Sequence, residues 1–144
     1  MLQDAPHFVA LDWNGTIVPH FGLPPFAGVA DALERLREAG IPLVVVSHAT
    51  QEQIDFEVAR AGESFAAVYG CEDKAGILSD LRLQYGGGVV LGDHPADGRA
   101  AEEAGVAFVQ AALAGQPRLP QAIARFEDWQ EVATLLLVPS TDLG

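Results

Sequence analysis

The amino-acid sequence predicts an α/β fold, a doubly wound parallel sheet covered by helices on both faces. Two patterns support this prediction. Short apolar runs alternate with longer segments in which apolar residues recur every three or four positions, the spacings of strands and amphipathic helices. Several of the short runs are apolar throughout, which is typical of parallel strands buried on both faces. Strands and helices that alternate in this way favour one parallel sheet with right-handed crossovers.

The first predicted strand covers residues 7–11, and the first predicted helix covers residues 25–39. Pro25 suits the first turn of a helix, and Gly40 suits the position just after its end. The apolar stripe of this helix is expected to consist of Phe26, Val29, Ala30, Leu33 and Leu36.

The second strand is predicted over residues 42–47, which form a β-branched run. Thr50 and Gln53 have the spacing of a capping box at the start of the next helix, which Gly62 ends. A short third strand is expected over residues 66–69.

The rest of the chain continues the alternation, and we expect one domain over residues 1–144. The remaining elements are predicted as a helix over 75–85, a strand over 88–91, a helix over 95–105, strands over 106–109 and 121–126, and a helix over 128–137. Pro139 would end the last helix, and residues 140–144 are expected to be a frayed tail.

Composition excludes several classes of function. The chain has 8 basic and 20 acidic residues and a formal net charge of −12, which disfavours nucleic acid and anionic membranes as partners. No apolar run approaches the roughly 20 residues that cross a bilayer. Cys71 is the single cysteine, so no disulfide forms within the chain, and residues 1–4 lack the pattern of a signal peptide. These features predict a cytoplasmic protein.

Polar residues stand at the carboxyl ends of the predicted strands, where ligands bind in sheets of this type. Asp12 follows the first strand, Ser47 ends the second, and Asp93 follows the fourth. Lys74, the only lysine, begins the helix after the third strand. Taken singly, three of these residues have plain interpretations: Asp12 as a turn aspartate, Ser47 as a strand-end hydroxyl and Lys74 as a solvated residue in the first turn of a helix. Together they would bring two carboxylates, a hydroxyl and an ammonium to one edge of the sheet.

The order D-x-x-G-T, then serine after an apolar strand, then lysine, then G-D-x-x-x-D resembles the haloacid dehalogenase superfamily of phosphatases and phosphotransferases. The resemblance covers residues 8–109 and implies a Rossmann-like core. It implies that Asp12 attacks phosphorus and becomes an aspartyl-phosphate. Ser47 would bind a phosphoryl oxygen, and Lys74 would offset negative charge there.

The same resemblance implies a Mg²⁺ site. Asp12, Asp93 and the backbone carbonyl of Asn14 would bind the ion, and Asp97 would orient the site from outside or, more simply, favour the amino end of its helix. Oxygen ligands of this kind suit Mg²⁺, which keeps several waters. Around the phosphate we also expect Thr16 and His48. A site this acidic would need the metal to accept a phosphorylated substrate.

The sequence departs from the family pattern at Asn14. Phosphatases of the family usually have a second aspartate there, which protonates the leaving group and then activates water. An amide cannot transfer a proton at neutral pH. Histidines near the motifs are possible substitutes, and His20, in the loop after Asp12, is the predicted proton shuttle. His48 and His94 are expected to be solvent-facing residues at helix starts.

No room for a cap domain exists between the motifs, since only eight residues separate Thr16 from Pro25. Capless members of the family act on macromolecules or form oligomers in which a neighbour covers the site, so a homo-oligomer is one expectation. The apolar loop 21–25 would then either meet a partner subunit or be buried against its own helix.

The leading hypothesis is a Mg²⁺-dependent phosphatase that works through an aspartyl-phosphate on Asp12. A phosphotransferase or acyl-phosphate hydrolase is the alternative within enzymes, because a good leaving group needs no proton. A non-catalytic phosphate- or Mg²⁺-binding domain is the alternative outside them. Asn14 motivates both alternatives.

Overall fold

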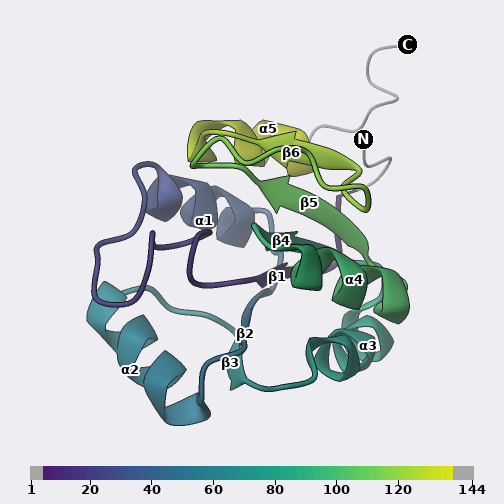
Figure 1. Ribbon diagram of the computed structural model, residues 1–144, viewed down its shortest axis with the longest axis horizontal. Coiled ribbons are helices and arrows are strands. Elements are labelled where there is room, and N and C mark those ends of the chain that lie inside the picture. Colours follow the sequence, from purple (N-terminus) through teal and green to yellow (C-terminus); the bar gives the residue numbers. More distant parts are fainter. Residues whose placement is uncertain (1–4, 138–144) are drawn as a thin grey trace.

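A six-stranded parallel sheet forms the centre of the computed structural model, which describes residues 5–137 (Figure 1). The strand order is β3-β2-β1-β4-β5-β6, and every neighbouring pair is parallel. The strands are β1 (Val9–Leu11), β2 (Leu43–Ser47), β3 (Ala67–Gly70), β4 (Val89–Gly92), β5 (Ala107–Ala111) and β6 (Ala124–Phe126). The predicted fold class is confirmed.

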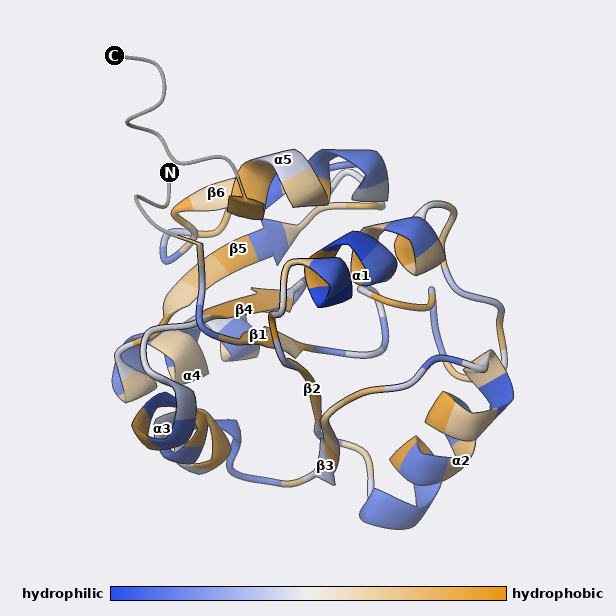
Figure 2. Cartoon of the chain, turned by 180° about the vertical axis from the view of Figure 1, so that it is seen from behind, coloured by the Kyte–Doolittle hydropathy of each residue, from blue (hydrophilic) through white to orange (hydrophobic). Residues whose placement is uncertain are grey.

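Helices cover the sheet on both faces, and each face has its own apolar core. The helices are α1 (Val29–Glu38), α2 (Gln51–Ala61), α3 (Lys74–Tyr85), α4 (Pro95–Ala104), the short 3₁₀ helix η1 (Trp129–Glu131) and α5 (Val132–Leu137). One core joins α1, α2 and α5 to the sheet, and the other joins α3 and α4 to it. Figure 2 shows that the central strands are largely hydrophobic, while α1 carries many hydrophilic residues.

The predicted elements are present with boundaries that shift by a few residues. The capping box of Thr50 and Gln53 is confirmed, and Gly62 ends α2 in a left-handed conformation. The sixth strand is shorter than predicted, and the last helix begins as a 3₁₀ turn. The predicted frayed tail over 140–144 lies outside the described residues.

The start of the first helix is the main correction. Helix α1 begins at Val29 rather than near Pro25. The amide of Phe26 donates to the carbonyl of Ile17, 2.8 Å away, and Gly28 has a φ of 88°, so this segment belongs to the preceding loop. Within the helix, Ala30 is exposed and Ala32 is buried in its place.

The topology fixes where a ligand can bind. The strand order runs outward in both directions from β1 and β4, so their carboxyl ends flank the switch point of the sheet, where ligands bind in open α/β folds. Among residues 5–137, no helix or strand stands outside the sheet and its two helical layers as a cap. None of the helices in this range has both the length and the hydrophobicity needed to cross a bilayer.

Candidate active site

Asp12 and Asp93 lie side by side because β1 and β4 are paired in register up to Leu11 and Leu91. The amide of Asp12 donates to the carbonyl of Leu91 at 3.0 Å, so the chain leaves β1 next to β4. Gly15 then turns the chain with a φ of 79°, a conformation that side chains disfavour. A Cβ atom on Gly15 would also overlap the carboxylate of Asp93. Glycine is therefore required at this position by both the turn and the neighbouring acid.

Lys74 links two of the site's carboxylates. Its Nζ atom lies 3.0 Å from Oδ1 of Asp12 and 2.7 Å from Oδ1 of Asp97. The side chains of Lys74 and Asp97 are 6% and 2% exposed, so this contact is almost fully removed from water. The second oxygen of Asp97 accepts the backbone N–H of His94 at 3.3 Å. Asp97 therefore fixes the ammonium that in turn holds Asp12.

The buried charges of the site are not balanced. Asp12, Asp93 and Asp97 each have an oxygen within 4.8 Å of the others, and Lys74 is the cation that contacts two of them, Asp12 and Asp97. Burial raises the pKa of all three aspartates above 3.8, and for Asp12 it outweighs the opposing charge of Lys74. Burial also lowers the pKa of Lys74, but the charges of Asp12 and Asp97 outweigh it and raise that pKa above 10.5. When all four groups are ionised, two negative charges remain uncompensated.

Ser47 and His48 approach the same site from the end of β2. The hydroxyl of Ser47 is buried and accepts the amide of Ala49 at 3.1 Å, which leaves its own proton free to be donated. Burial, followed by the positive charge of Lys74, lowers the pKa of His48 below 6.5. His48 is therefore mainly neutral at neutral pH.

His94 begins α4 and forms its N-terminal cap. Its Nδ1 atom accepts the amide of Ala96 at 3.0 Å, so a neutral ring has its proton on Nε2. The expectation that His94 is a helix-start residue is confirmed. It is not directed only to solvent, however, because both His48 and His94 line the pocket described next.

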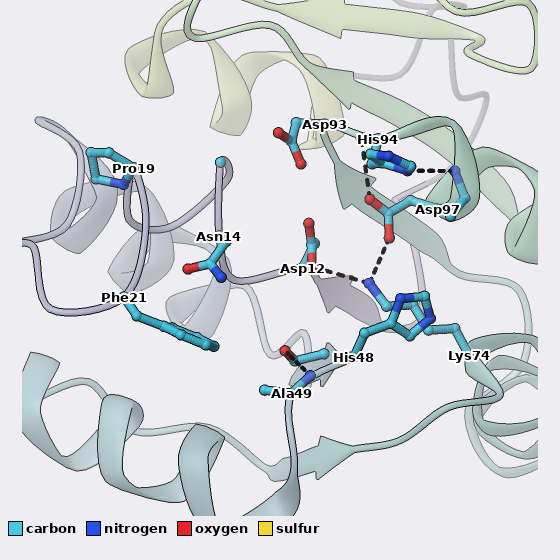
Figure 3. A pocket seen from close by; sticks show the side chains of 13 residues that line it. Asp12, Asn14, Pro19, Phe21, His48, Ala49, Lys74, Asp93, His94 and Asp97 are labelled. Atoms are coloured by element: carbon cyan, nitrogen blue, oxygen red, sulfur yellow. Dashed lines mark hydrogen bonds and ion pairs between the residues drawn. The ribbon is translucent and has the colours of Figure 1, made fainter.

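A pocket of about 420 Å³ contains most of the predicted site residues (Figure 3). The predicted residues that line it are Asp12, Asn14, Ser47, His48, Lys74, Asp93 and Asp97. Thr16 does not line it, since its side chain is fully buried beneath the loop and its carbonyl accepts the indole N–H of Trp129 at 2.8 Å. His20 is exposed and does not line it either, so the structure does not bring the predicted proton shuttle to the carboxylates.

Sequence reasoning missed the apolar part of the pocket wall. Pro19 and Phe21, which flank His20 in the sequence, both line the pocket. Phe21 is 38% exposed, an unusual placement for a large apolar side chain in a loop. The apolar composition of the loop was the available signal, but it did not distinguish a pocket wall from a subunit contact.

The donor set fits a hard divalent cation. Three clustered carboxylates with an excess of negative charge offer oxygen ligands of the kind that Mg²⁺ prefers. Asp97 is committed to Lys74 and to the amide of His94, so Asp12 and Asp93 are the carboxylates with oxygens to spare. The backbone carbonyl of Asn14 remains the further ligand that the resemblance implies.

Comparison with known families decides the classification. Residues 12–111 match the family model described as haloacid dehalogenase-like hydrolase, which is well over half of the chain. The chain belongs to this family. This is the family that the sequence motifs resemble, and the match begins at Asp12 itself. A comparison with curated proteins finds no match.

Solved structures with the same fold include phosphatases. A hydrolase of this family from Deinococcus radiodurans R1, with bound phosphate and sodium, is 21% identical with a TM-score of 0.69 and covers 83% of this chain, which spans 64% of that protein. D,D-heptose 1,7-bisphosphate phosphatase from B. bronchiseptica, complexed with magnesium and phosphate, is 18% identical with a TM-score of 0.71. The alignment covers 90% of this chain and 97% of the phosphatase.

A third structure is the cobalt-bound deoxy-D-mannose-octulosonate 8-phosphate phosphatase from Haemophilus influenzae. It is 16% identical and has a TM-score of 0.72. The alignment covers 92% of this chain and 87% of that phosphatase. Identities this low establish the shared fold and leave the substrate of this chain open.

Proposed function

We propose that this protein is a Mg²⁺-dependent phosphomonoesterase that uses Asp12 as its nucleophile. The observation that carries the proposal is the position of Asp12, which is held at 3.0 Å by Lys74 at the edge of a pocket that also contains Asp93 and Ser47. Phosphoryl transfer depends on positioning and charge stabilisation more than on proton transfer, and this site supplies both.

The reaction has two steps. A carboxylate oxygen of Asp12 forms a bond to phosphorus as the bond from phosphorus to the leaving oxygen breaks, and that oxygen takes a proton from water. Water then attacks the phosphorus of the aspartyl-phosphate, releases phosphate and regenerates the carboxylate. Lys74 stabilises negative charge on the reacting oxygens, and Ser47 donates its hydroxyl proton to a phosphoryl oxygen.

A bound Mg²⁺ would supply the positive charge that the site lacks. Asp12, Asp93 and the carbonyl of Asn14 would hold it, and its charge would neutralise phosphoryl oxygens. The support is the uncompensated charge of the three carboxylates, together with the magnesium and phosphate bound by the heptose bisphosphate phosphatase of the same fold.

Asn14 supports a narrower alternative within the same chemistry. It lines the pocket with an amide that cannot protonate a leaving alkoxide. Acyl phosphates and other substrates with good leaving groups avoid this need, whether the phosphoryl group passes to water or to another acceptor. For simple phosphomonoesters the leaving oxygen would therefore take its proton from water in the open pocket.

The decisive experiment measures phosphate release from a panel of phosphomonoesters and acyl phosphates, with Mg²⁺ and with EDTA. Asp12→Asn is the blank, and Asp80→Asn, an exposed change on α3, is the matched control. We expect Mg²⁺-dependent release that Asp12→Asn abolishes and Asp80→Asn retains. Release by the wild type equal to that of the blank across the panel would contradict the enzyme and favour a phosphate- or Mg²⁺-binding domain.

The wider setting of the activity remains a proposal. We infer a phosphorylated substrate, a cytoplasmic location and a homo-oligomer as the means of covering the open pocket. Sedimentation of the protein with and without a phosphate analogue tests the oligomer.

A further inference from the structure

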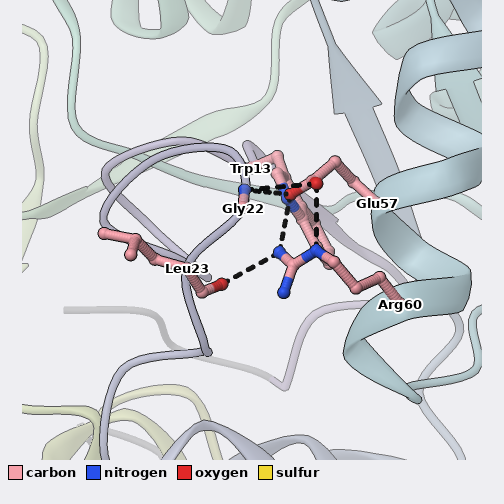
Figure 4. A network of polar contacts seen from close by, with 5 residues as sticks. All are labelled: Trp13, Gly22, Leu23, Glu57 and Arg60. Carbon is pink, nitrogen blue, oxygen red and sulfur yellow. Dashed lines mark hydrogen bonds and ion pairs between the residues drawn. The ribbon is translucent and has the colours of Figure 1, made fainter.

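A further buried carboxylate, outside the cluster of three aspartates, lies close to the pocket without lining it. Glu57 on α2 is 5% exposed, and it accepts the indole N–H of Trp13 at 3.2 Å and the amide of Gly22 at 3.2 Å (Figure 4). Arg60 donates to both of its oxygens, at 3.0 and 2.8 Å, and also to the carbonyl of Leu23 at 2.9 Å. One carboxylate therefore ties the loop after β1 to a helix at two separate places.

The two tied residues are neighbours of pocket residues. Trp13 directly follows Asp12, and Gly22 directly follows Phe21. Both Asp12 and Phe21 line the pocket. The contacts of Glu57 thus end one residue away from the proposed nucleophile and one residue away from the largest apolar side chain of the pocket wall.

Phe21 lies on the same side of Asp12 as Asn14, the position whose usual aspartate protonates the leaving group in phosphatases of this family. Figure 3 shows Phe21 and Asn14 on the opposite side of Asp12 from Lys74 and Asp97. The attacking and leaving oxygens of a phosphoryl transfer are roughly in line, so the leaving group points away from Asp12. An aromatic side chain at the mouth offers a face on which an aryl or other apolar leaving group can pack.

We propose that Glu57 is a positioning residue that, together with Arg60, holds Phe21 at the pocket mouth, where Phe21 selects substrates with aromatic or apolar leaving groups. This inference rests on the proposed function, because it names the substrate class for the same site. Glu57 itself touches no substrate and acts through the loop.

The first test measures loop order without any need for activity. Hydrogen exchange of peptides that cover residues 19–25 is compared between the wild type and Glu57→Gln. A neutral amide cannot pair with Arg60 as a carboxylate does, so we expect faster exchange in this loop. Unchanged exchange would overturn the positioning role.

The matched control is a second Arg–Glu pair that also holds a loop carbonyl. Arg37 contacts Glu63 at 3.2 Å and donates to the carbonyl of Ser64. These residues adjoin the start of β2, at the edge of the sheet opposite the site. Glu63→Gln should leave exchange over residues 19–25 unchanged.

The second test is a double-mutant cycle that a merely structural role would not satisfy. The dissociation constant of phenylphosphonate, a non-hydrolysable aryl ligand, is measured with Mg²⁺ present, alongside KM and kcat for an aryl phosphate and for acetyl phosphate. We expect Phe21→Ala and Glu57→Gln each to raise the Kd of phenylphosphonate and the KM of the aryl phosphate about 3- to 10-fold. The KM of acetyl phosphate should change little. Combined, they should have no more effect than Phe21→Ala alone, since residues acting through one another are not additive.

The outcomes separate this inference from the proposed function. Coupled effects on phenylphosphonate binding without any turnover would support the role of Glu57 and reject the phosphatase. Turnover with additive effects, or with equal effects on the aryl and acetyl substrates, would overturn the role of Glu57 and leave the phosphatase standing. Glu57→Asp, which keeps the charge, should recover part of the lost aryl affinity.

Discussion

Two buried acid–base networks within residues 5–137, one in the pocket and one beside it, differ in charge balance. In the pocket, two of three clustered carboxylates share the ammonium of Lys74, and the third, Asp93, has no cation in contact among the described residues. Burial raises the pKa of each acid above 3.8. Beside the pocket, the one carboxylate of Glu57 receives Arg60 and two further N–H donors, and the hydrogen bonds from Arg60 lower its pKa below 4.5. The balanced network of Glu57 and Arg60 is suited to a structural role, holding the loop against α2. The unbalanced one is suited to a ligand that brings positive charge.

Removing the ammonium of Lys74 should have the largest effect on both stability and turnover. Lys74→Met leaves Asp97 and Asp12 buried without a counter-charge, so we expect the free energy of unfolding to fall by about 3 kcal/mol at neutral pH. Turnover should fall by about 10²- to 10³-fold, because charge on the reacting oxygens loses its stabilisation. Thermal unfolding and phosphate release measure the two effects. Arg99→Met, an exposed change on α4, should alter neither.

Placing an acid at position 14 should increase turnover in the pocket network. Asn14→Asp places a group that can transfer protons in the pocket, and general acid–base catalysis contributes about 10²- to 10⁴-fold. We expect kcat on a simple phosphomonoester to rise by roughly 10²-fold and kcat on acetyl phosphate to change little. Asn14→Ala removes the amide without adding an acid, and an equal rise in that variant would contradict the explanation.

Adding Mg²⁺ should stabilise the unbalanced network alone. A ligand present at a hundred times its dissociation constant stabilises the folded state by about 2.7 kcal/mol, which corresponds to a rise in Tm of roughly 5–10 °C for a chain of this size. Calorimetry with Mg²⁺ and then EDTA checks this. The rise should disappear in Asp93→Asn and persist in Glu57→Gln. A rise that persists in both would place the ion elsewhere.

Acid should affect the two networks in opposite directions, with the smallest effect. A carboxyl with a raised pKa binds protons more readily in the folded state, so without Mg²⁺ the three aspartates should add stability as the pH falls through their raised folded values toward 3.8. Glu57 has a lowered pKa, so its contribution is present above its ordinary value of 4.5 and is lost as the pH falls through its lower folded value.

The measurement is Tm against pH in EDTA. We expect a maximum at mildly acidic pH, with a rise on the order of a few degrees before stability declines. Asp93→Asn should flatten the rise, and Glu57→Gln should flatten the part of the decline below pH 4.5. A curve that falls steadily from neutral pH in both the wild type and Asp93→Asn would refute the opposite responses.

The sequence was sufficient for the parts of the site that directly follow strands. Asp12, Ser47 and Asp93 were predicted because parallel strands bring their carboxyl ends to one edge, and a two-residue error in a strand boundary does not move that edge. The start of α1 was predicted wrongly because Pro25 suits a helix start and a turn equally well. The hydrogen bond from Phe26 to Ile17 decides between them, and it is not visible in the local pattern.

Contacts distant in sequence were beyond prediction. Glu57 has the spacing of an ordinary solvated residue on an amphipathic helix, and its partners Trp13 and Gly22 lie 44 and 35 positions away. His20 was predicted near the carboxylates from its place in the loop, yet the loop turns its neighbours Pro19 and Phe21 to the pocket instead. Backbone direction within such a loop depends on these tertiary contacts.

The single lysine makes the centre of the site open to selective observation. Lys74 is the only lysine of the chain, and its side chain is 6% exposed. Incorporation of ¹⁵N-labelled lysine into an otherwise unlabelled protein would therefore give a single lysine side-chain resonance. That signal would report directly on events at Asp12, without assignment of the rest of the spectrum. The same scarcity means that amine-reactive surfaces and dyes would have almost nothing to attach to on the outside of this protein.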